Sequence, residues 1–189
     1  QLDSNLLFVR IFLNSPLNAK FVYRFYLKDL THNQRLQSVE KKSTVRAAKP
    51  QDIPAILALV RELAAYEKAP DEVSNTEEMM LKDGFGSTKI YDAFVAEYES
   101  KIVGTAITYY RYSTWKGKCL YLEDLIVSES YRGIGAGKQL FNTCLIFGKQ
   151  MGCKRMVWQV LDWNEPALGF YKTYGAHLDG EWINGSLAL

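Results

Sequence analysis

Hydrophobic and polar residues follow two different periods along the chain from Thr44 onward, which predicts a domain of strands and helices. Apolar residues recur every three or four positions in the segments expected to be helices, which are 52–67, 74–83, 138–151 and 164–174. Segments rich in Val, Ile, Tyr and Thr are expected to be strands, at 45–48, 91–97, 101–112, 119–127, 155–160 and 177–183. This order predicts the α/β class, with a mixed sheet and helices on both of its faces.

The expected helix ends rest on capping residues. Asp52 is a suitable N-cap for the first helix and Ser74 for the second, which Gly84 is expected to stop. Asn164 precedes Glu-Pro and suits the start of the last helix, and Gly175 suits its end.

The strongest local signal is the junction between the strand ending at Val127 and the following helix. It reads Arg132-Gly-Ile-Gly-Ala-Gly-Lys138. Glycines let the backbone approach a ligand closely, and the free amides of a helix start form an anion site suited to a diphosphate. A nucleotide-binding P-loop needs Ser or Thr after Gly-Lys, but Gln139 stands there, and the run is GxGxG rather than the dinucleotide GxGxxG. A tight turn that only starts a helix is the simpler alternative.

Composition and charge narrow the function classes. The chain has 189 residues, of which 48% are apolar and 13% aromatic, enough for one domain with a full core and some extra length. Residues 1–43 carry a net charge of +4, which leaves −2 for residues 44–189. The mildly acidic body argues against nucleic acid and suits a cationic substrate. Residues 1–43 are expected to be an extension outside the fold, with a basic targeting segment as the alternative, and the domain is expected to span 44–189.

Cysteine spacing indicates the cellular compartment, and hydropathy indicates whether the chain crosses a membrane. Cys119, Cys144 and Cys153 have neither disulfide nor zinc spacing, so no metal is expected and a cytoplasmic setting is favoured. No apolar window reaches the roughly 18 residues of a membrane-spanning helix, so no membrane association is expected.

Two longer motifs carry a family resemblance. Arg132-x-x-Gly135-x-Gly137 resembles the coenzyme A pyrophosphate motif of the GCN5-related N-acetyltransferases, and the segment 163–176 resembles their second signature. Five segments are similar to the diamine acetyltransferases, also called spermidine/spermine acetyltransferases: Arg61-Glu-Leu-Ala-Ala-Tyr-Glu67, Asp83-Gly-Phe-Gly86, Trp115-Lys-Gly-Lys118, Tyr121-Leu-Glu-Asp124 and Trp163-Asn-Glu-Pro166. The resemblance implies a mostly antiparallel sheet, splayed at a coenzyme A cleft. It also implies a homodimer that transfers acetyl from acetyl-CoA to a primary amine of a small molecule.

The resemblance also implies which residues hold the cofactor. A bulge in the strand is expected to turn a backbone amide near Leu125 toward the thioester carbonyl. From its own sequence context, Asn164 is simply a good N-cap. The cofactor-binding residues are expected to be Leu125, Ile126, Val127, Arg132, Gly133, Ile134, Gly135, Ala136, Gly137, Lys138, Asn164 and Tyr171.

The chemistry needs a base for the protonated amine and an acid for the departing thiolate. Glu123, in the middle of an apolar strand, is the candidate base, acting through a water. Tyr171 is the candidate acid, because the family's Phe-Tyr tyrosine sits beside the coenzyme A sulfur. The simpler alternatives are an exposed strand carboxylate and a packing tyrosine.

The amine site is expected to combine carboxylates and aromatic rings. Tyr66, Glu67 and Trp115 are candidates, together with Glu123 and Asp124, because carboxylates and ring faces attract an ammonium group. Close relatives carry an acidic residue two positions before this tryptophan, where Ser113 stands here. That departure favours a shorter amine, such as a thialysine-like one, over a long polyamine.

Three alternatives stay open. They are a catalytically silent module that binds coenzyme A, an acetyltransferase for protein N-termini or lysines, and a ping-pong mechanism through Cys119. The third is disfavoured, because neither histidine is near Cys119 in sequence.

Overall fold

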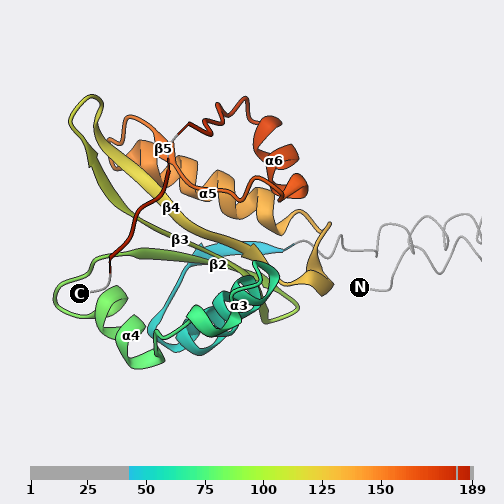
Figure 1. The fold of residues 1–189 in the computed structure, drawn as a ribbon. Helices are drawn as coiled ribbons and strands as arrows, with labels where there is room; N and C mark the ends of the chain where they lie inside the picture. The colour runs from blue at the N-terminus through green and yellow to red at the C-terminus, as the bar shows by residue number, and fades with distance from the viewer. Residues whose placement is uncertain (1–42, 182, 188–189) are drawn as a thin grey trace, which may run out of the picture. The chain divides into compact units, whose positions relative to one another are not determined.

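A five-stranded sheet forms the centre of the protein (Figure 1). The computed structural model describes residues 43–181 and 183–187. The strands lie in the order β1-β2-β3-β4-β5 and comprise Thr44–Ala47, Asp92–Tyr98, Lys101–Ser113, Gly117–Val127 and Met156–Val157. Neighbours from β1 to β4 are antiparallel, and β5 is parallel to β4. This confirms the expected mixed, mostly antiparallel sheet. The extension expected at residues 1–43 lies outside the described residues except for Ser43.

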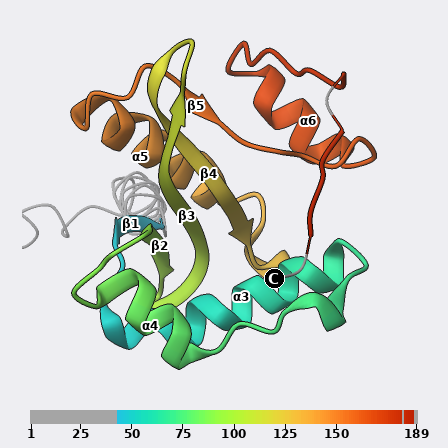
Figure 2. The same ribbon diagram turned by 60° about the vertical axis from the view of Figure 1, so that its left-hand side comes forward.

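Helices cover both faces of the sheet (Figure 2). On one face lie α3 (Ile53–Tyr66) and α4 (Glu77–Phe85), and on the other lie α5 (Ala136–Gln150) and α6 (Glu165–Lys172). The apolar face of α5 packs on β3 and β4 through a cluster that includes Leu140, Phe141, Cys144, Leu120 and Leu122. A second cluster, which includes Ile53, Ile56, Leu57, Val95 and Ile107, joins α3 to the opposite face. Three short 3-10 turns complete the order: η1 (Pro50–Asp52), η2 (Pro70–Glu72) and η3 (Glu129–Tyr131).

An irregularity in β4 confirms the bulge that the resemblance implied. Thr108 pairs with Leu122, but the next residue on β3, Ile107, pairs with Asp124, so Glu123 is an extra residue on β4. Before the bulge, alternate residues point to opposite faces. The extra residue resets this alternation and brings Asp124 to the face of Ile107, which packs with α3.

The sheet splays beside this bulge. β5 pairs with β4 only at Leu120–Met156 and Tyr121–Val157. The predicted strand at 155–160 is therefore too long, because β5 comprises only Met156–Val157. Beyond the pairing, the Tyr121 hydroxyl donates to the side-chain oxygen of Gln159 at 2.9 Å, so a side-chain contact continues where the ladder ends. One edge of β4 thus loses its strand partner from Leu122 onward.

The expected last strand at 177–183 is also wrong, because the described residues after α6 form no strand. The Asp179 carboxylate accepts a hydrogen bond from the Glu181 amide at 2.9 Å, and Gly180 lies between them. Such an Asp-Gly turn bends the backbone out of an extended ladder.

Two helix boundaries differ from expectation. Thr76, not Ser74, caps α4, because its hydroxyl accepts from the Met79 amide at 3.2 Å. Gly84 does not stop this helix but lies within it, where a Cβ atom would meet the Tyr91 ring at 2.5 Å. That glycine makes room for an aromatic side chain instead of ending the helix.

Asp52 lies where the N-cap of α3 was expected but makes no capping bond to that helix. Its carboxylate accepts from the Lys49 amide at 2.7 Å and from the Arg46 guanidinium at 2.6 Å. Arg46 also donates to Glu97 of β2 at 2.6 Å. The ion pair with Arg46 lowers the pKa of Asp52, which is only 5% exposed. The network fixes the start of α3 to the first two strands.

Candidate active site

The glycine-rich turn forms the start of α5 in the conformation that an anion site needs. Gly133 and Gly135 have φ angles of 85° and 84°, which side-chain-bearing residues rarely adopt. Gly135 is the N-cap of α5, no side chain caps the helix, and its first turn holds no acidic residue. The first amides of α5 are therefore available to a negatively charged group. Arg132 and Lys138 lie exposed on either side of the turn.

Tyr66 lies among the expected cofactor residues. Its hydroxyl donates to the Asn164 side-chain oxygen at 3.2 Å, and the Arg132 guanidinium carbon lies 5.1 Å from the centre of its ring. Asn164 caps α6 as its sequence context predicted, accepting from the Ala167 amide at 3.2 Å. Tyr66 therefore joins the end of α3 to the glycine-rich turn and to the start of α6.

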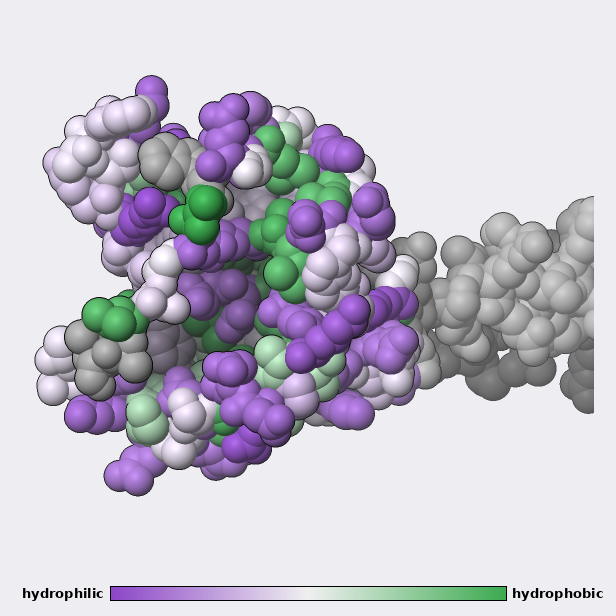
Figure 3. All heavy atoms as spheres, viewed as in Figure 1, coloured by the Kyte–Doolittle hydropathy of each residue, from purple (hydrophilic) through white to green (hydrophobic). Residues whose placement is uncertain are grey.

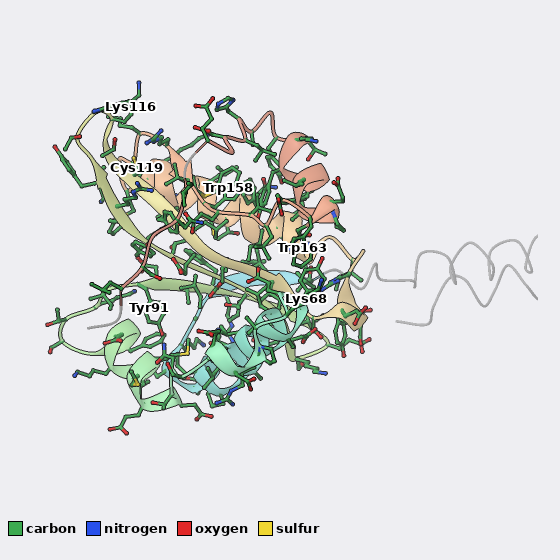
Figure 4. The ribbon with its side chains drawn as sticks, in the orientation of Figure 1. Lys68, Tyr91, Lys116, Cys119, Trp158 and Trp163 are labelled. Carbon is green, nitrogen blue, oxygen red and sulfur yellow. The ribbon has the colours of Figure 1, made fainter. Side chains whose placement is uncertain are left out.

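An aromatic contact extends this cluster. The ring of Trp163 lies 5.8 Å from that of Tyr66, and the Lys68 ammonium lies 5.1 Å from the Trp163 ring (Figure 4). Lys68, two residues beyond the end of α3, has a φ angle of 64°, which is uncommon for a residue other than glycine. Neither Lys68 nor Trp163 was predicted from the sequence as a site residue.

Tyr171 lies in the aromatic layer between α5 and α6. It is 7% exposed and packs against the rings of Trp158 and Phe141, with centroids 4.7 and 5.6 Å away. Burial raises the pKa of its phenol to about 12. The hydroxyl is thus held in its protonated form, as a proton donor to a thiolate must be.

Three carboxylates gather at the bulge in β4. Burial, reinforced by the charges of Glu123 and Glu67, raises the pKa of Asp124 to about 6. Burial also raises the pKa of Glu67, which follows α3 directly. Glu123 is exposed. The three side chains come from two elements, and together they make a site that favours an arriving cation.

Tyrosines continue the site along the same face of the sheet. Tyr109 and Tyr121 pair across β3 and β4 with ring centroids 5.0 Å apart. The pKa of each phenol is raised, by burial first and then by the charge of Glu123. Figure 3 shows a recess between the region of α4 and the segment that follows α6, with hydrophilic residues inside it. Strand alternation was the signal that could have placed these tyrosines here, because Tyr121 stands two residues before Glu123 on β4 and Tyr109 lies opposite Tyr121 on β3.

Within one chain, Trp115 lies far from the three carboxylates at the bulge of β4. It lies in the turn between β3 and β4 and is 85% exposed. Asp124 is seven residues further along β4 than Gly117, about 23 Å at the usual strand rise. Cys119 is buried, and its thiol contacts the Gly117 carbonyl at 3.4 Å. The ping-pong alternative gains no support from that position.

The sequence profile of the acetyltransferase (GNAT) family matches residues 57–176. The chain belongs to this family. The glycine-rich turn, the bulged strand and α6 all lie inside the matched region, so the candidate site is the part of the chain that the GNAT family shares.

Relatives agree with this assignment. Thialysine N-epsilon-acetyltransferase of Bos taurus is 42% identical over 140 residues, covering 70% of this chain and 82% of the relative. The human spermidine/spermine N(1)-acetyltransferase-like protein 1 is 34% identical over 139 residues, covering 70% of this chain but 20% of the relative. An aminoglycoside acetyltransferase from a soil metagenomic sample, solved with sisomicin, has the same fold. Its TM-score is 0.66 at 20% identity, covering 80% of this chain and 99% of that one.

Residues 43–181 and 183–187 contain neither a membrane-spanning helix nor a candidate metal site. No helix there is long and apolar enough to cross a membrane. In the same part of the chain, no group of three or more His, Cys, Asp or Glu side chains is placed to hold a metal ion.

Proposed function

We propose that this GNAT enzyme transfers an acetyl group from acetyl-CoA to a primary amine of a small molecule, in one ternary complex. One observation carries the proposal. A single strand–turn–helix unit holds the paired carboxylates at the bulge of β4 and, directly after that strand, the uncapped anion site at the start of α5. Such a unit places the acyl donor beside the group that receives an amine.

The residues of this chain fit acetyl-CoA. The glycine-rich turn offers its amides and the positive end of the α5 dipole to the diphosphate, and Arg132 and Lys138 add positive charge. The edge of β4 that β5 leaves from Leu122 onward would lie along the pantetheine arm. We propose that Leu125, Ile126 and Val127 contact that arm, and that Asn164 does so from the start of α6. Acetyl-CoA supplies the thioester that the amine attacks.

The reaction needs three steps, and the chain has a group for each. Glu123, exposed on the bulge, accepts a proton from the ammonium through a water and can pass it to solvent. The free amine attacks the thioester carbonyl, and the backbone amide near Leu125 stabilises the oxyanion. As the carbon–sulfur bond breaks, Tyr171 donates its proton to the departing thiolate, and the second proton lost from the attacking nitrogen restores the Tyr171 phenol. The products are the N-acetyl amine and coenzyme A.

One observation favours Asp124 as a second candidate for the general base. The raised pKa of Asp124, about 6, lies nearer to the working pH than that of an ordinary carboxyl group. If Asp124 were the base, the rate of its Asn variant would stay low at every pH. A Glu123→Gln defect would instead shrink as the pH rises, because hydroxide and bulk water can replace a base that works through water.

The substrate that fits best is a small amine with a second charged group, such as a diamine, a polyamine or a thialysine-like amine. Asp124, Glu67 and Glu123 form an acidic site that would hold an ammonium group. Ser113 leaves one fewer carboxylate on the β3–β4 hairpin, which favours the shorter amines. Tyr66 does not join this acidic site; it acts through its hydrogen bond to the side chain of Asn164.

A panel of amines assayed for coenzyme A release tests the proposal. Diamines and thialysine should exceed neutral alkylamines of matched length in kcat/KM. Peptides with free N-termini or lysines as better substrates would favour a protein acetyltransferase. Tight acetyl-CoA binding without turnover of any amine would favour a silent coenzyme A module.

We also propose a homodimer in a cytoplasmic setting. The exposed side chains of Trp115 and Tyr112, 85% and 76% accessible, support an interface at the β3–β4 hairpin. The three cysteines are all unpaired, which suits a reducing compartment. Light scattering of the purified protein tests the dimer, and a monomer at micromolar concentration would contradict it.

A further inference from the structure

Tyr109 lies on the face of the sheet that carries the carboxylates at the bulge. It belongs to β3 and pairs with Tyr121 of β4, with ring centroids 5.0 Å apart and ring planes inclined by 32°. Ile107, two residues before Tyr109, pairs with Asp124, so Tyr109 and Asp124 share one face. Glu123 is the extra residue of the bulge, directly before Asp124.

The Tyr109 hydroxyl is directed at the Glu123 carboxylate. Burial is the largest cause of the raised pKa of Tyr109, and the charge of Glu123 and a hydrogen bond with its side chain raise that pKa further. The phenol is the donor in such a pair, because an ionised carboxylate only accepts. The Tyr121 hydroxyl donates instead to the side-chain oxygen of Gln159 at 2.9 Å. Of the two paired phenols, Tyr109 is therefore the one that serves Glu123.

Glu123 needs a group that holds it. It is exposed on the bulge, and no salt bridge among the described residues includes it. Arg111 is the cation on this face, and its guanidinium carbon lies 5.9 Å from the centre of the Tyr121 ring. The charges of Asp124 and Glu67 repel a third carboxylate at the bulge. A free glutamate side chain samples many rotamers, so without a hydrogen-bond donor Glu123 would turn away toward solvent.

We propose that Tyr109 is a positioning residue for the general base, and that its hydroxyl holds the Glu123 carboxylate toward the water that takes the proton of the attacking ammonium. An ionised carboxylate has about four acceptor positions, so one bond to Tyr109 leaves the others for that water. Tyr109 acts through Glu123 and does not itself touch the substrate. The inference rests on the proposed acetyltransferase activity with Glu123 as its base, and it adds the group that orients this base.

Tyr109→Phe keeps the ring and removes only the hydroxyl. We expect kcat at pH 7 to fall about 10- to 100-fold, the range of a hydrogen bond to a charged group, with the KM of both substrates nearly constant. The defect should shrink as the pH rises toward 9, because hydroxide and bulk water replace a base that works through water.

Tyr110→Phe is the matched control. Tyr110 is the next residue on β3 and points to the opposite face, where its ring centroid lies 6.3 Å from that of Phe147. The variant loses the same single atom from the same strand and should keep the wild-type kcat. Wild-type kcat in Tyr109→Phe, or an equal loss in Tyr110→Phe, would overturn the inference.

A double-mutant cycle separates positioning of the base from a general structural role. In a Glu123→Gln background, Tyr109→Phe should lower kcat less than twofold, because no carboxylate is left to orient. The same loss from Tyr109→Phe in both backgrounds would show that Tyr109 acts independently of Glu123 and would overturn the inference. An unchanged kcat in Glu123→Gln alone would refute the base and this role of Tyr109 together.

Unfolding of the same four proteins tests the contact without turnover. If the wild-type protein acetylates no amine, the proposed activity fails, but chemical denaturation at pH 7 still measures the coupling between the two side chains. A double variant that loses less stability than the sum of the two single losses would support the hydrogen bond between Tyr109 and Glu123. Strictly additive losses would overturn it.

Discussion

Asp124→Asn should stabilise the substrate-free protein while impairing its activity. Burial and two neighbouring carboxylates raise the pKa of Asp124 from 3.8 to about 6. Because the folded state holds this proton to higher pH than the unfolded state, stability falls as the pH rises from about 4 to about 6. Above pH 7 the cost is the full shift, about 3 kcal/mol at 1.36 kcal/mol per unit of pKa. Asparagine has the same shape but no charge, so it avoids this cost.

Thermal unfolding at pH 8 and pH 4 measures the effect. The variant should unfold at a temperature about 6–12 °C higher than wild type at pH 8, since 1 kcal/mol is worth about 2–4 °C in a chain of this size. The difference should become small near pH 4, where Asp124 is protonated in the folded state and about half protonated in the unfolded state. Glu123→Gln is the control, because Glu123 is exposed and its replacement should change stability far less.

Activity should move in the opposite direction. The kcat/KM of Asp124→Asn for diamines should fall at least tenfold, because the arriving ammonium loses a charged partner. A variant no more stable than wild type at pH 8 would show that the carboxylate is not held at a cost, and would refute the electrostatic argument. Unchanged diamine kinetics would show that Asp124 does not face the substrate.

Four further predictions concern other parts of the fold. Tyr171→Phe should lower kcat about 10²–10⁴-fold with KM nearly constant at every pH from 6 to 9; wild-type kcat would assign the acid role elsewhere. Tyr66→Phe removes one hydrogen bond, worth about 1 kcal/mol, and should raise the KM for acetyl-CoA about fivefold; an effect on the amine KM alone would contradict its place in the cofactor site. Arg46→Met leaves Asp52 buried and unpaired, so chemical denaturation at pH 7 should show a loss of about 3–5 kcal/mol. The ion pair lowers the pKa of Asp52, so the difference in unfolding free energy between wild type and Arg46→Met should narrow below pH 3.8, where Asp52 becomes protonated. A loss of the same size at every pH would exclude the ion pair as its source. A shortened chain beginning at Ser43, which is buried and accepts from Gln139 at 3.0 Å, should keep its kcat/KM, and a folded but inactive product would give the preceding residues a catalytic role.

The local sequence determined much of this protein because its signals act over a few residues. The glycines at 133 and 135 occur where φ is positive, and a helix starts there as the spacing predicted. Apolar periodicity located α3 and α5, since each buries one continuous face. Asn164 caps α6 with a hydrogen bond to a residue three positions away. Such features depend on backbone geometry within one or two turns, which neighbouring residues fix.

Features that join distant segments were decided only by the tertiary structure. β5 ends after two pairs with β4, and a side-chain contact between Tyr121 and Gln159, 38 residues apart, follows where the ladder ends. Gly84 looked like a helix stop, yet it is a site of close packing against a ring that arrives from outside the helix.

The site shows the same division. Sequence motifs named Glu123 and Asp124, but alternation alone would place them on opposite faces, and only the pairing of β3 with β4 shows the extra residue that resets the faces. The raised pKa of Asp124 has a cause that no local pattern contains. Burial beneath neighbouring elements, the charge of the adjacent Glu123 and the charge of Glu67, 57 positions earlier, act together on one carboxyl group. Electrostatic energy depends on distance and on exposure to water, and the folded chain alone sets both.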